Sequence, residues 1–414
     1  MRVPLYVFIF AILGSVSSKL ISVHVVFRHG ARAPVLNVTS EEAKTYFYRG
    51  LGQLTDEGIE QAQLIGELLK DRYVDSTFID AKMIPSQLVF RSSPVERCLM
   101  TIQTVGNVMF SNVTPPVQTV ARDDDFLLLP KMDCPFLIDD YQKHFNLSEK
   151  EKNVARKHIW DISERALARA ALDTEHLKNR SKENIPALLL EKEAGLAVPS
   201  WFNEEAYKEA KEVFYGALSV MSSVGDYYSP RGIRPKAGLL LNQIFEDINK
   251  RVNCYQENKK DCELKRFQAF STHDILILSI LEALGLRESV LGPKTPPEFM
   301  ATLIIETRLI DGEAVVKVMY RKLPKDYNPD VVTGLVRNCP ANQEFCPVKL
   351  FTSCCNDFLT SDAKTECYGP PNHWFMTPLS WIFIAVSLAL LIVVAVLFLL
   401  LIRYKKRTSL NLKV

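Results

Sequence analysis

Apolar positions in the first hundred residues of this 414-residue chain follow two periods. Residues 20–27 are almost continuously apolar and rich in β-branched side chains, as is typical of a strand buried on both faces. After Thr55, which can cap a helix, apolar residues recur at helical spacing to about residue 72. Residues 87–90 predict a second strand. The segment 93–96, Ser-Pro-Val-Glu, predicts that a second helix begins there with a capping box.

The pattern changes between about residues 125 and 235, where strand signals fade and charged amphipathic segments dominate. This stretch predicts a helical insertion that caps the core. Beyond it, the pattern predicts a helix over residues 235–252, a strand over 266–270 and a very apolar helix from His273-Asp274 to about 285.

Two further strands, residues 300–309 and 314–321, are joined through Asp311-Gly312, a strong hairpin signal. Alternating strands and helices predict an α/β fold, a three-layer sandwich with a mainly parallel central sheet and an inserted helical cap.

The two ends of the chain predict targeting segments. Residues 1–18 combine an early Arg2, a short apolar run and small residues before a cleavage point, as in a secretory signal peptide. Residues 381–402 are apolar apart from Ser387 and long enough to cross a bilayer as a helix. Basic residues follow at once, so the tail is predicted to be cytoplasmic and the protein to be a type I single-pass membrane protein.

These signals divide the chain into seven parts. They are a signal peptide (1–18), the first part of the core (19–124), the helical cap (125–234), the second part of the core (235–368), a linker (369–380), the transmembrane helix (381–402) and a cytoplasmic tail (403–414).

Charge excludes one class of partner. The whole chain has a formal charge of +2, but Arg2 contributes +1 and the five basic residues after Ile402 contribute +5, so residues 19–402 carry −4. A mildly acidic ectodomain does not favour nucleic-acid binding. The histidines have no metal-ligand spacing, so neither a metal nor another cofactor is expected.

Nine cysteines in an exported chain predict disulfides, and the odd number leaves at least one thiol unpaired. Cys98, on the apolar face of a predicted helix, is the candidate for a buried free thiol. Cys254 and Cys262 flank a polar loop that a disulfide could close. Four sequons predict glycosylation, at Asn37, Asn112, Asn146 and Asn179.

Chemistry is concentrated just past the ends of three predicted strands. Arg28-His29-Gly30-x-Arg32-x-Pro34 follows the first strand, Arg91 the second and His273-Asp274 the third. Ligands bind at the carboxyl ends of parallel strands, so these groups are expected at one edge. Arginine forks match phosphate oxygens, and a histidine between them is placed to attack the phosphorus that they hold. The leaving alkoxide then needs a nearby acid.

With these motifs, the chain resembles the branch-two histidine phosphatases, which include the lysosomal and prostatic acid phosphatases of animals. Residues 28–34 match the RHG-x-R-x-P signature and His273-Asp274 the HD motif; Gly52-Gln53-Leu54-Thr55 and Arg91-Ser92-Ser93 also fit. The likeness spans most of residues 20–368.

The resemblance implies an acid phosphatase of phosphate monoesters or phosphorylated peptides, lysosomal or at the plasma membrane and often homodimeric. His29 would become phosphorylated, and Asp274 would protonate the leaving group. Four side chains would hold the phosphate: Arg28, Arg32, Arg91 and His273. The resemblance also implies disulfides Cys134–Cys367 and Cys339–Cys346.

One departure from the family is Ala31, which stands where mammalian acid phosphatases often carry aspartate. It leads us to expect an altered substrate choice or pH profile. Two alternatives stay open at this point. One is a phytase-like or other inositol-polyphosphate phosphatase of the same fold, and the other is an adhesion or receptor ectodomain that has lost catalysis.

Overall fold

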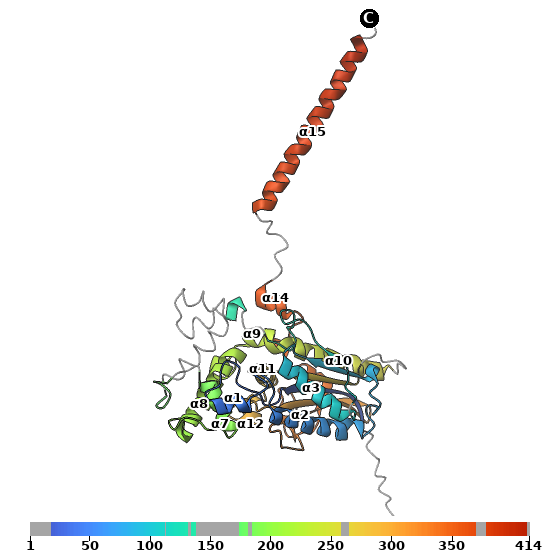
Figure 1. Cartoon of the computed structure of the whole chain (residues 1–414). Helices are drawn as coiled ribbons and strands as arrows, with labels where there is room; N and C mark the ends of the chain where they lie inside the picture. Colours follow the sequence, from blue (N-terminus) through green and yellow to red (C-terminus); the bar gives the residue numbers. More distant parts are fainter. Residues whose placement is uncertain are drawn as a thin grey trace, which may run out of the picture. The chain divides into compact units, whose positions relative to one another are not determined.

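A single sheet organises the larger of two compact units, residues 1–367 and 368–414 (Figure 1). The computed structural model describes residues 18–111, 113–130, 134–137, 174–180, 184–257, 265–369 and 378–411. The strands are β1 Ser18–Arg28, β2 Leu88–Ser92, β3 Val117–Gln118, β4 Phe267–Thr272, β5 Thr302–Ile310, β6 Glu313–Arg321, β7 Asp330–Val331 and β8 Cys346–Pro347.

The sheet order is β3-β2-β4-β1-β5-β6-β7, with β8 also paired to β6. Strands β1, β4, β2 and β3 are parallel, whereas β5, β6, β7 and β8 join by antiparallel pairs. The expectation of a mainly parallel sheet is therefore wrong for the C-terminal strands, which are antiparallel, so the sheet as a whole is mixed. Residues 297–301 pass beside the carboxyl end of β1, where the Arg28 amide donates to the Ala301 carbonyl at 3.0 Å, so β5 must run back along β1.

The helices are α1 Glu41–Tyr46, α2 Asp56–Leu69, α3 Glu96–Met109, α7 Ile185–Glu193, α8 Glu204–Ser222, α9 Pro230–Ile233, α10 Leu239–Gln256, α11 Asp274–Leu284, α12 Arg287–Leu291, α13 Val348–Thr352, α14 Ala363–Tyr368 and α15 Pro378–Asn411. Short 3₁₀ turns lie at 85–87, 225–227, 333–335 and 356–358, and π-helical turns at 70–74 and 234–238.

Strand β1 lies between two apolar layers. Val23, Val25 and Phe27 pack with α2 and α3 in one buried cluster, and Ile21 and Val26 with α10 and α11 in another. Figure 1 shows α2 and α3 on one side of the sheet and α10 on the other. The register of β1 shifts between Leu20 and Ser22, and side chains alternate between the two layers only from Val23 to Phe27. Each fully buried side chain of this kind contributes about 1.5–3 kcal/mol, so β1 holds both layers of the sandwich in place.

The predicted hairpin is confirmed. Asp311 and Gly312 both have positive φ, 49° and 87°, between β5 and β6. A two-residue turn of this kind matches the twist of the strands, which explains why the sequence signal was sufficient.

The capping box predicted at Ser93 is wrong, because α3 begins at Glu96 and Val95 is its N-cap. The Ser93 hydroxyl instead lies 2.9 Å from His273 Nε2, and its amide donates to the Ser271 carbonyl at 3.0 Å. The Ser93 side chain, which the local sequence pattern assigned to the helix N-cap, thus contacts a distant segment of the chain instead.

The described part of the predicted cap has its own apolar cluster, in which Phe202 and Val213 pack with Leu188. A disulfide between Cys134 and Cys367 joins this cluster. The cap boundaries at 125 and 234 stay predictions.

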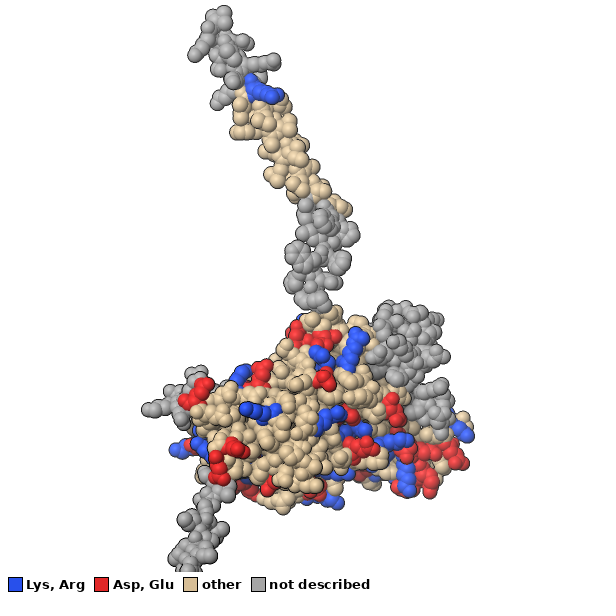
Figure 2. Space-filling view, turned by 180° about the vertical axis from the view of Figure 1, so that it is seen from behind, with Lys and Arg blue, Asp and Glu red and all other residues tan. Residues whose placement is uncertain are grey.

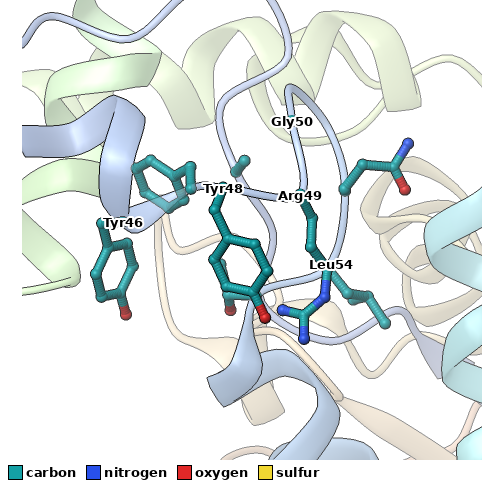
Figure 3. Close-up of a pocket in the computed structure, with 9 residues that line it drawn as sticks. Tyr46, Tyr48, Arg49, Gly50 and Leu54 are labelled. Atoms are coloured by element: carbon teal, nitrogen blue, oxygen red, sulfur yellow. The ribbon is translucent and has the colours of Figure 1, made fainter. Parts of the chain in front are cut away.

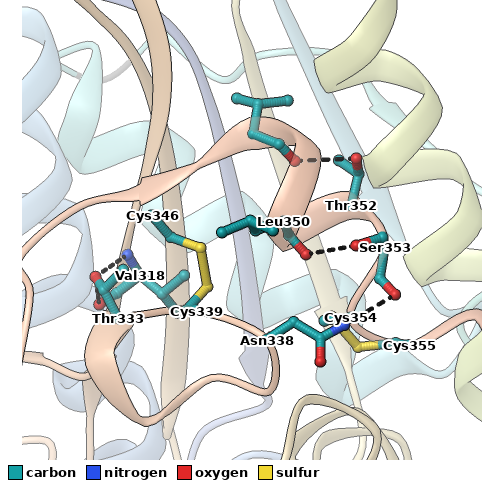
Figure 4. The surroundings of a disulfide bond; sticks show 11 residues. Val318, Thr333, Asn338, Cys339, Cys346, Leu350, Thr352, Ser353, Cys354 and Cys355 are labelled. Atoms are coloured by element: carbon teal, nitrogen blue, oxygen red, sulfur yellow. Dashed lines mark hydrogen bonds between the residues drawn. A yellow bond between two sulfur atoms is a disulfide. The ribbon is translucent and has the colours of Figure 1, made fainter. Parts of the chain in front are cut away.

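Three disulfides lie among the described residues: Cys134–Cys367, Cys339–Cys346 and the adjacent pair Cys354–Cys355 (Figure 4). The first two are the pairs that the resemblance implies. Cys254 is also disulfide-bonded, whereas Cys262 lies outside the described residues. Cys98 is free and fully buried, as predicted.

The second unit contains α15, of which Ala385–Arg403 is long and apolar enough to cross a membrane (Figure 2). Its 19 residues span about 28 Å at ~1.5 Å per residue, close to the ~30 Å of hydrocarbon in a bilayer. Residues 1–17 of the predicted signal peptide fall outside the described residues, as do Asn112 and Asn146, while Asn37 and Asn179 are described.

Candidate active site

The carboxyl ends of β1, β4 and β2 bring the predicted residues together. Arg28 is paired in register with Thr272, so His29 and His273 follow at the same level. The His29 amide donates to the Thr272 carbonyl at 3.0 Å, and the Met300 amide donates to the His29 carbonyl at 3.2 Å. His29 is thereby held between β4 and the segment before β5. We call residues 28–34 the catalytic loop.

The contacts of His29 define its tautomer. Its Nδ1 lies 2.9 Å from the Gly30 carbonyl, which can only accept, so Nδ1 carries the proton and Nε2 keeps its lone pair. Arg97 Nε donates to that Nε2 at 3.0 Å. Burial, followed by the charges of Arg97 and Arg28, holds the pKa of His29 well below 6.5. The ring is therefore neutral in mildly acidic solution, and its unprotonated Nε2 accepts the bond from Arg97.

Two arginines of the catalytic loop flank His29. Arg28 forms an ion pair with Asp274 at 2.8 Å, donates to the Pro297 carbonyl at 2.7 Å and stacks 4.1 Å above the Phe299 ring. Arg32 donates one bond to the Ala33 carbonyl. Burial and the nearby Arg97 and Arg28 lower the pKa of Arg32 to about 9. The buried Nε atoms of Arg28 and Arg32 have no hydrogen-bond partner among the described residues, so both N–H groups are available to an anion.

His273 lies opposite His29, with 5.5 Å between ring centroids. The Ser93 hydroxyl and the Cys98 sulfur lie 2.9 and 3.6 Å from its Nε2. Burial and Arg97 lower the pKa of His273 to about 3, so it too is neutral at mildly acidic pH. Burial also raises the pKa of Cys98 to about 12, which keeps this thiol protonated.

Asp274 is the candidate acid, yet it is ionised in the free site. Burial alone would raise the pKa of its carboxyl, but Arg28 and Arg32 outweigh this effect and lower it. One oxygen accepts from Arg28, and the other accepts from the Ile275 amide at 2.9 Å. A charge that competes for these arginines would therefore raise the pKa of Asp274.

The sequence analysis named Arg91 as a phosphate-binding residue, but in the structure it is Arg97 that contacts His29. Arg91 is buried and paired with Asp125 at 2.9 Å, and it also donates to the Ser92 carbonyl. Arg97, in the first turn of α3, contacts both histidines, with Nη2 3.5 Å from His273 Nδ1. Sequence reasoning missed Arg97 because it looked for site residues just past the ends of predicted strands, where Arg91 lies. The signal was available in the arginine six residues after Arg91.

The catalytic loop is pressed against the start of α2. A Cβ on Gly58 would lie 2.1 Å from the Ala31 carbonyl oxygen, and a Cβ on Gly30 would lie 2.3 Å from the Gly58 oxygen. Thr55 donates to the Ala31 carbonyl through its amide, at 3.0 Å, and its hydroxyl, at 3.2 Å. Gln61 accepts from the Ala31 amide at 2.9 Å. Two glycines thus permit the close approach that positions His29.

A pocket of about 540 Å³ opens beside the catalytic loop, with Ala31, Arg32 and Phe299 in its lining. It is large enough for a small organic phosphate. A neighbouring pocket lined by Tyr46, Tyr48 and Arg49 has only about 10 Å³, room for about one water, so it does not hold substrate (Figure 3). Within the described ranges, no group of three or more His, Cys, Asp or Glu residues could hold a metal ion.

Residues 19–321 match the sequence profile of the histidine phosphatase superfamily, branch 2. The chain belongs to this family. It is accordingly a phosphoric monoester hydrolase. The matched region contains His29, Arg97 and the His273-Asp274 pair.

Relatives agree with this assignment. A Caenorhabditis elegans protein named provisionally as acid phosphatase 1 is 59% identical over 421 residues, covering 100% of this chain and 99% of its own. Mouse prostatic acid phosphatase is 26% identical over 86% of this chain and 91% of its own. The solved phytase of Citrobacter braakii covers 84% of this chain and 99% of its own with a TM-score of 0.57 and 15% identity, which shows the shared fold.

Proposed function

We propose that this histidine phosphatase is an acid phosphatase that transfers the phosphoryl group of a monoester to His29 Nε2 and needs no metal. The observation that carries the proposal is the state of His29. Its Nδ1 proton is committed to the Gly30 carbonyl, and its Nε2 faces the guanidinium of Arg97 at 3.0 Å. The nucleophilic lone pair and the donors for the phosphate oxygens thus meet at one point.

Phosphate binding would fall to Arg28, Arg32, Arg97 and His273. The Arg97 Nε–H, which now bonds Nε2, would turn to a phosphate oxygen as the substrate enters and so release the lone pair. Arg97 takes the role that the sequence assigned to Arg91, because Arg91 is already committed to Asp125. Fixed cationic donors stabilise the charge that develops on the transferring phosphoryl group.

Asp274 would protonate the leaving oxygen, but its ion pair with Arg28 means that the free enzyme does not hold that proton. A bound phosphate competes for Arg28 and Arg32 and so raises the pKa of Asp274. The proton can then come from the substrate, because a phosphate monoester is largely a monoanion below a second pKa of about 6. Water then attacks the phosphohistidine, with Asp274 accepting its proton.

The test uses the full-length chain in detergent with p-nitrophenyl phosphate and excess chelator at about pH 5. We expect turnover by the parent, near-complete loss in His29→Ala and a slow enzyme in Asp274→Asn. An alkaline quench of the Asp274→Asn enzyme with ³²P-labelled substrate should trap label on the protein in a base-stable form that is lost on later exposure to acid. Full activity in His29→Ala would refute the mechanism. A parent protein that is inactive but unfolds cooperatively on heating, and is therefore folded, would favour the catalytically silent ectodomain.

The phytase-like alternative is less well supported by the pocket. Its lining includes Glu57, Glu60, Glu193 and Glu298, and carboxylates repel a polyanion such as inositol hexakisphosphate. Turnover of inositol hexakisphosphate above that of the aryl phosphate would reverse this ranking.

We also propose that α15 anchors the chain in a membrane, with the catalytic unit lumenal or extracellular. The length of Ala385–Arg403 and the basic residues that follow support this orientation. Glycosidase-sensitive sugar at Asn37 or Asn179 and protection of the first unit from protease in sealed vesicles are the expected results. Protease digestion of the catalytic unit in intact microsomes would contradict this orientation.

A further inference from the structure

The pocket beside the catalytic loop has an unusual lining for an enzyme that binds an anion. Apart from Arg32, its charged residues are four glutamates and two lysines, Lys211 and Lys325, which leaves two net negative charges. With the other described residues, none of the four glutamates forms an ion pair within 4.0 Å. Because the charge of Lys211 acts on Glu193, the carboxylates available to a ligand are those of Glu57, Glu60 and Glu298.

Two of these carboxylates are joined to the catalytic machinery. Glu298 immediately precedes Phe299, whose ring stacks on Arg28 at 4.1 Å and lies 5.9 Å from the His29 ring. Glu57 accepts from Gln61 at 2.9 Å, and Gln61 in turn accepts from the amide of Ala31. The carboxylates therefore lie in a pocket that adjoins the catalytic loop and Phe299.

Aromatic rings complete the lining. Tyr46, Phe47, Tyr207 and Phe299 all reach this pocket. The Tyr207 hydroxyl donates to Glu193 at 3.1 Å and so holds a ring beside a carboxyl group. Phe299 already faces Arg28, and Tyr207 already faces Lys192 and Lys211 at 5.1 and 5.5 Å, so Tyr46 and Phe47 are the rings that are left for a ligand. Ring faces and carboxylates together are the groups that bind ammonium ions, and quaternary ammonium most of all.

From this lining, and resting on the proposed phosphatase function, we infer that the enzyme selects phosphate monoesters whose leaving group carries an ammonium ion, such as choline phosphate and ethanolamine phosphate. The arginines hold the phosphate end, and the glutamates and rings hold the cationic end. The same charges disfavour substrates with a second phosphate.

The experiment compares choline phosphate with 3,3-dimethylbutyl phosphate, its uncharged isostere, on the full-length enzyme. Because the two alcohols differ in intrinsic reactivity, the measurement is the change in the ratio of their kcat/KM values when carboxylates are neutralised. We expect Glu60→Gln/Glu298→Gln to lower this ratio about fivefold, which corresponds to about 1 kcal/mol. Raising the salt concentration should lower the wild-type ratio in the same direction, since partly exposed charges are screened.

Glu67→Gln is the matched control, because Glu67 is exposed on the same helix as Glu60, two turns further on, and is not part of the pocket. Its ratio should equal that of the wild type. An unchanged ratio in the double variant, with p-nitrophenyl phosphate still hydrolysed by the wild type, would overturn the inference and leave the phosphatase function standing. A wild type that hydrolyses none of the three esters would remove the proposed function and this inference with it.

Discussion

Replacing Gly58 by alanine would force α2 and the catalytic loop apart. The added Cβ would lie 2.1 Å from the Ala31 carbonyl oxygen, and ordinary contact begins at 3.4 Å, so a separation of about 1.3 Å is needed. Neither side yields easily. The Ala31 carbonyl oxygen is a backbone atom that accepts two hydrogen bonds from Thr55, and the Ala31 amide donates a third to Gln61.

The displacement acts on both stability and catalysis. Overpacking of this kind costs about 1–3 kcal/mol. His29 is two residues from Ala31, so a shift of this size moves the nucleophile by an amount that can reduce the rate about 10²-fold. We therefore expect Gly58→Ala to fold with a lowered melting temperature and a kcat about two orders of magnitude below wild type on p-nitrophenyl phosphate.

Gly66→Ala separates the two effects. It lies on the same helix, but its Cβ would meet the Val108 side chain at 2.6 Å in the contact between α2 and α3. Its melting temperature should also fall, while kcat stays within about twofold because only core packing changes. The two variants are compared by thermal melting, kcat and KM at equal folded fraction. Equal kcat values in the two variants would refute the claim that the Gly58 contact positions His29.

Other predictions test the remaining groups. Arg97→Lys should lower kcat/KM on p-nitrophenyl phosphate about 10²-fold with little effect on stability, whereas Arg91→Ala should lower the melting temperature because it leaves a buried carboxylate unpaired; the opposite pattern would restore Arg91 to the site. The pKa values of His29 and His273 lie below 6.5 in the folded state, so the unfolded chain binds more protons and stability should fall as pH drops from about 6.5 toward 3. Denaturant unfolding at several pH values measures this, and a drop of equal size in His29→Ala would show that His29 contributes nothing. Ala31→Asp should change the pH profile or the substrate ratio, since Ala31 lines the pocket; identical kinetics would count against that role.

Local pattern and motif spacing were enough for the features that neighbouring residues create. The apolar run of β1, the Thr55 cap of α2 and the Asp311-Gly312 hairpin all appear in the structure, because each depends on backbone preferences within a few residues. The grouping of Arg28, His29 and His273 was also predictable, since parallel strands present their carboxyl ends at one edge.

Tertiary structure alone decided which arginine reaches the nucleophile. Arg91 and Arg97 are chemically equivalent in the sequence. Asp125, more than thirty residues beyond Arg91, forms an ion pair with Arg91 and leaves Arg97 to contact His29. The Ser93 hydroxyl likewise contacts His273, 180 residues away, instead of capping α3. The segment around Glu298 reaches the site only because β5 runs antiparallel to β1. Local sequence carries no signal for such contacts, because a buried polar group takes whichever distant partner the packed chain supplies.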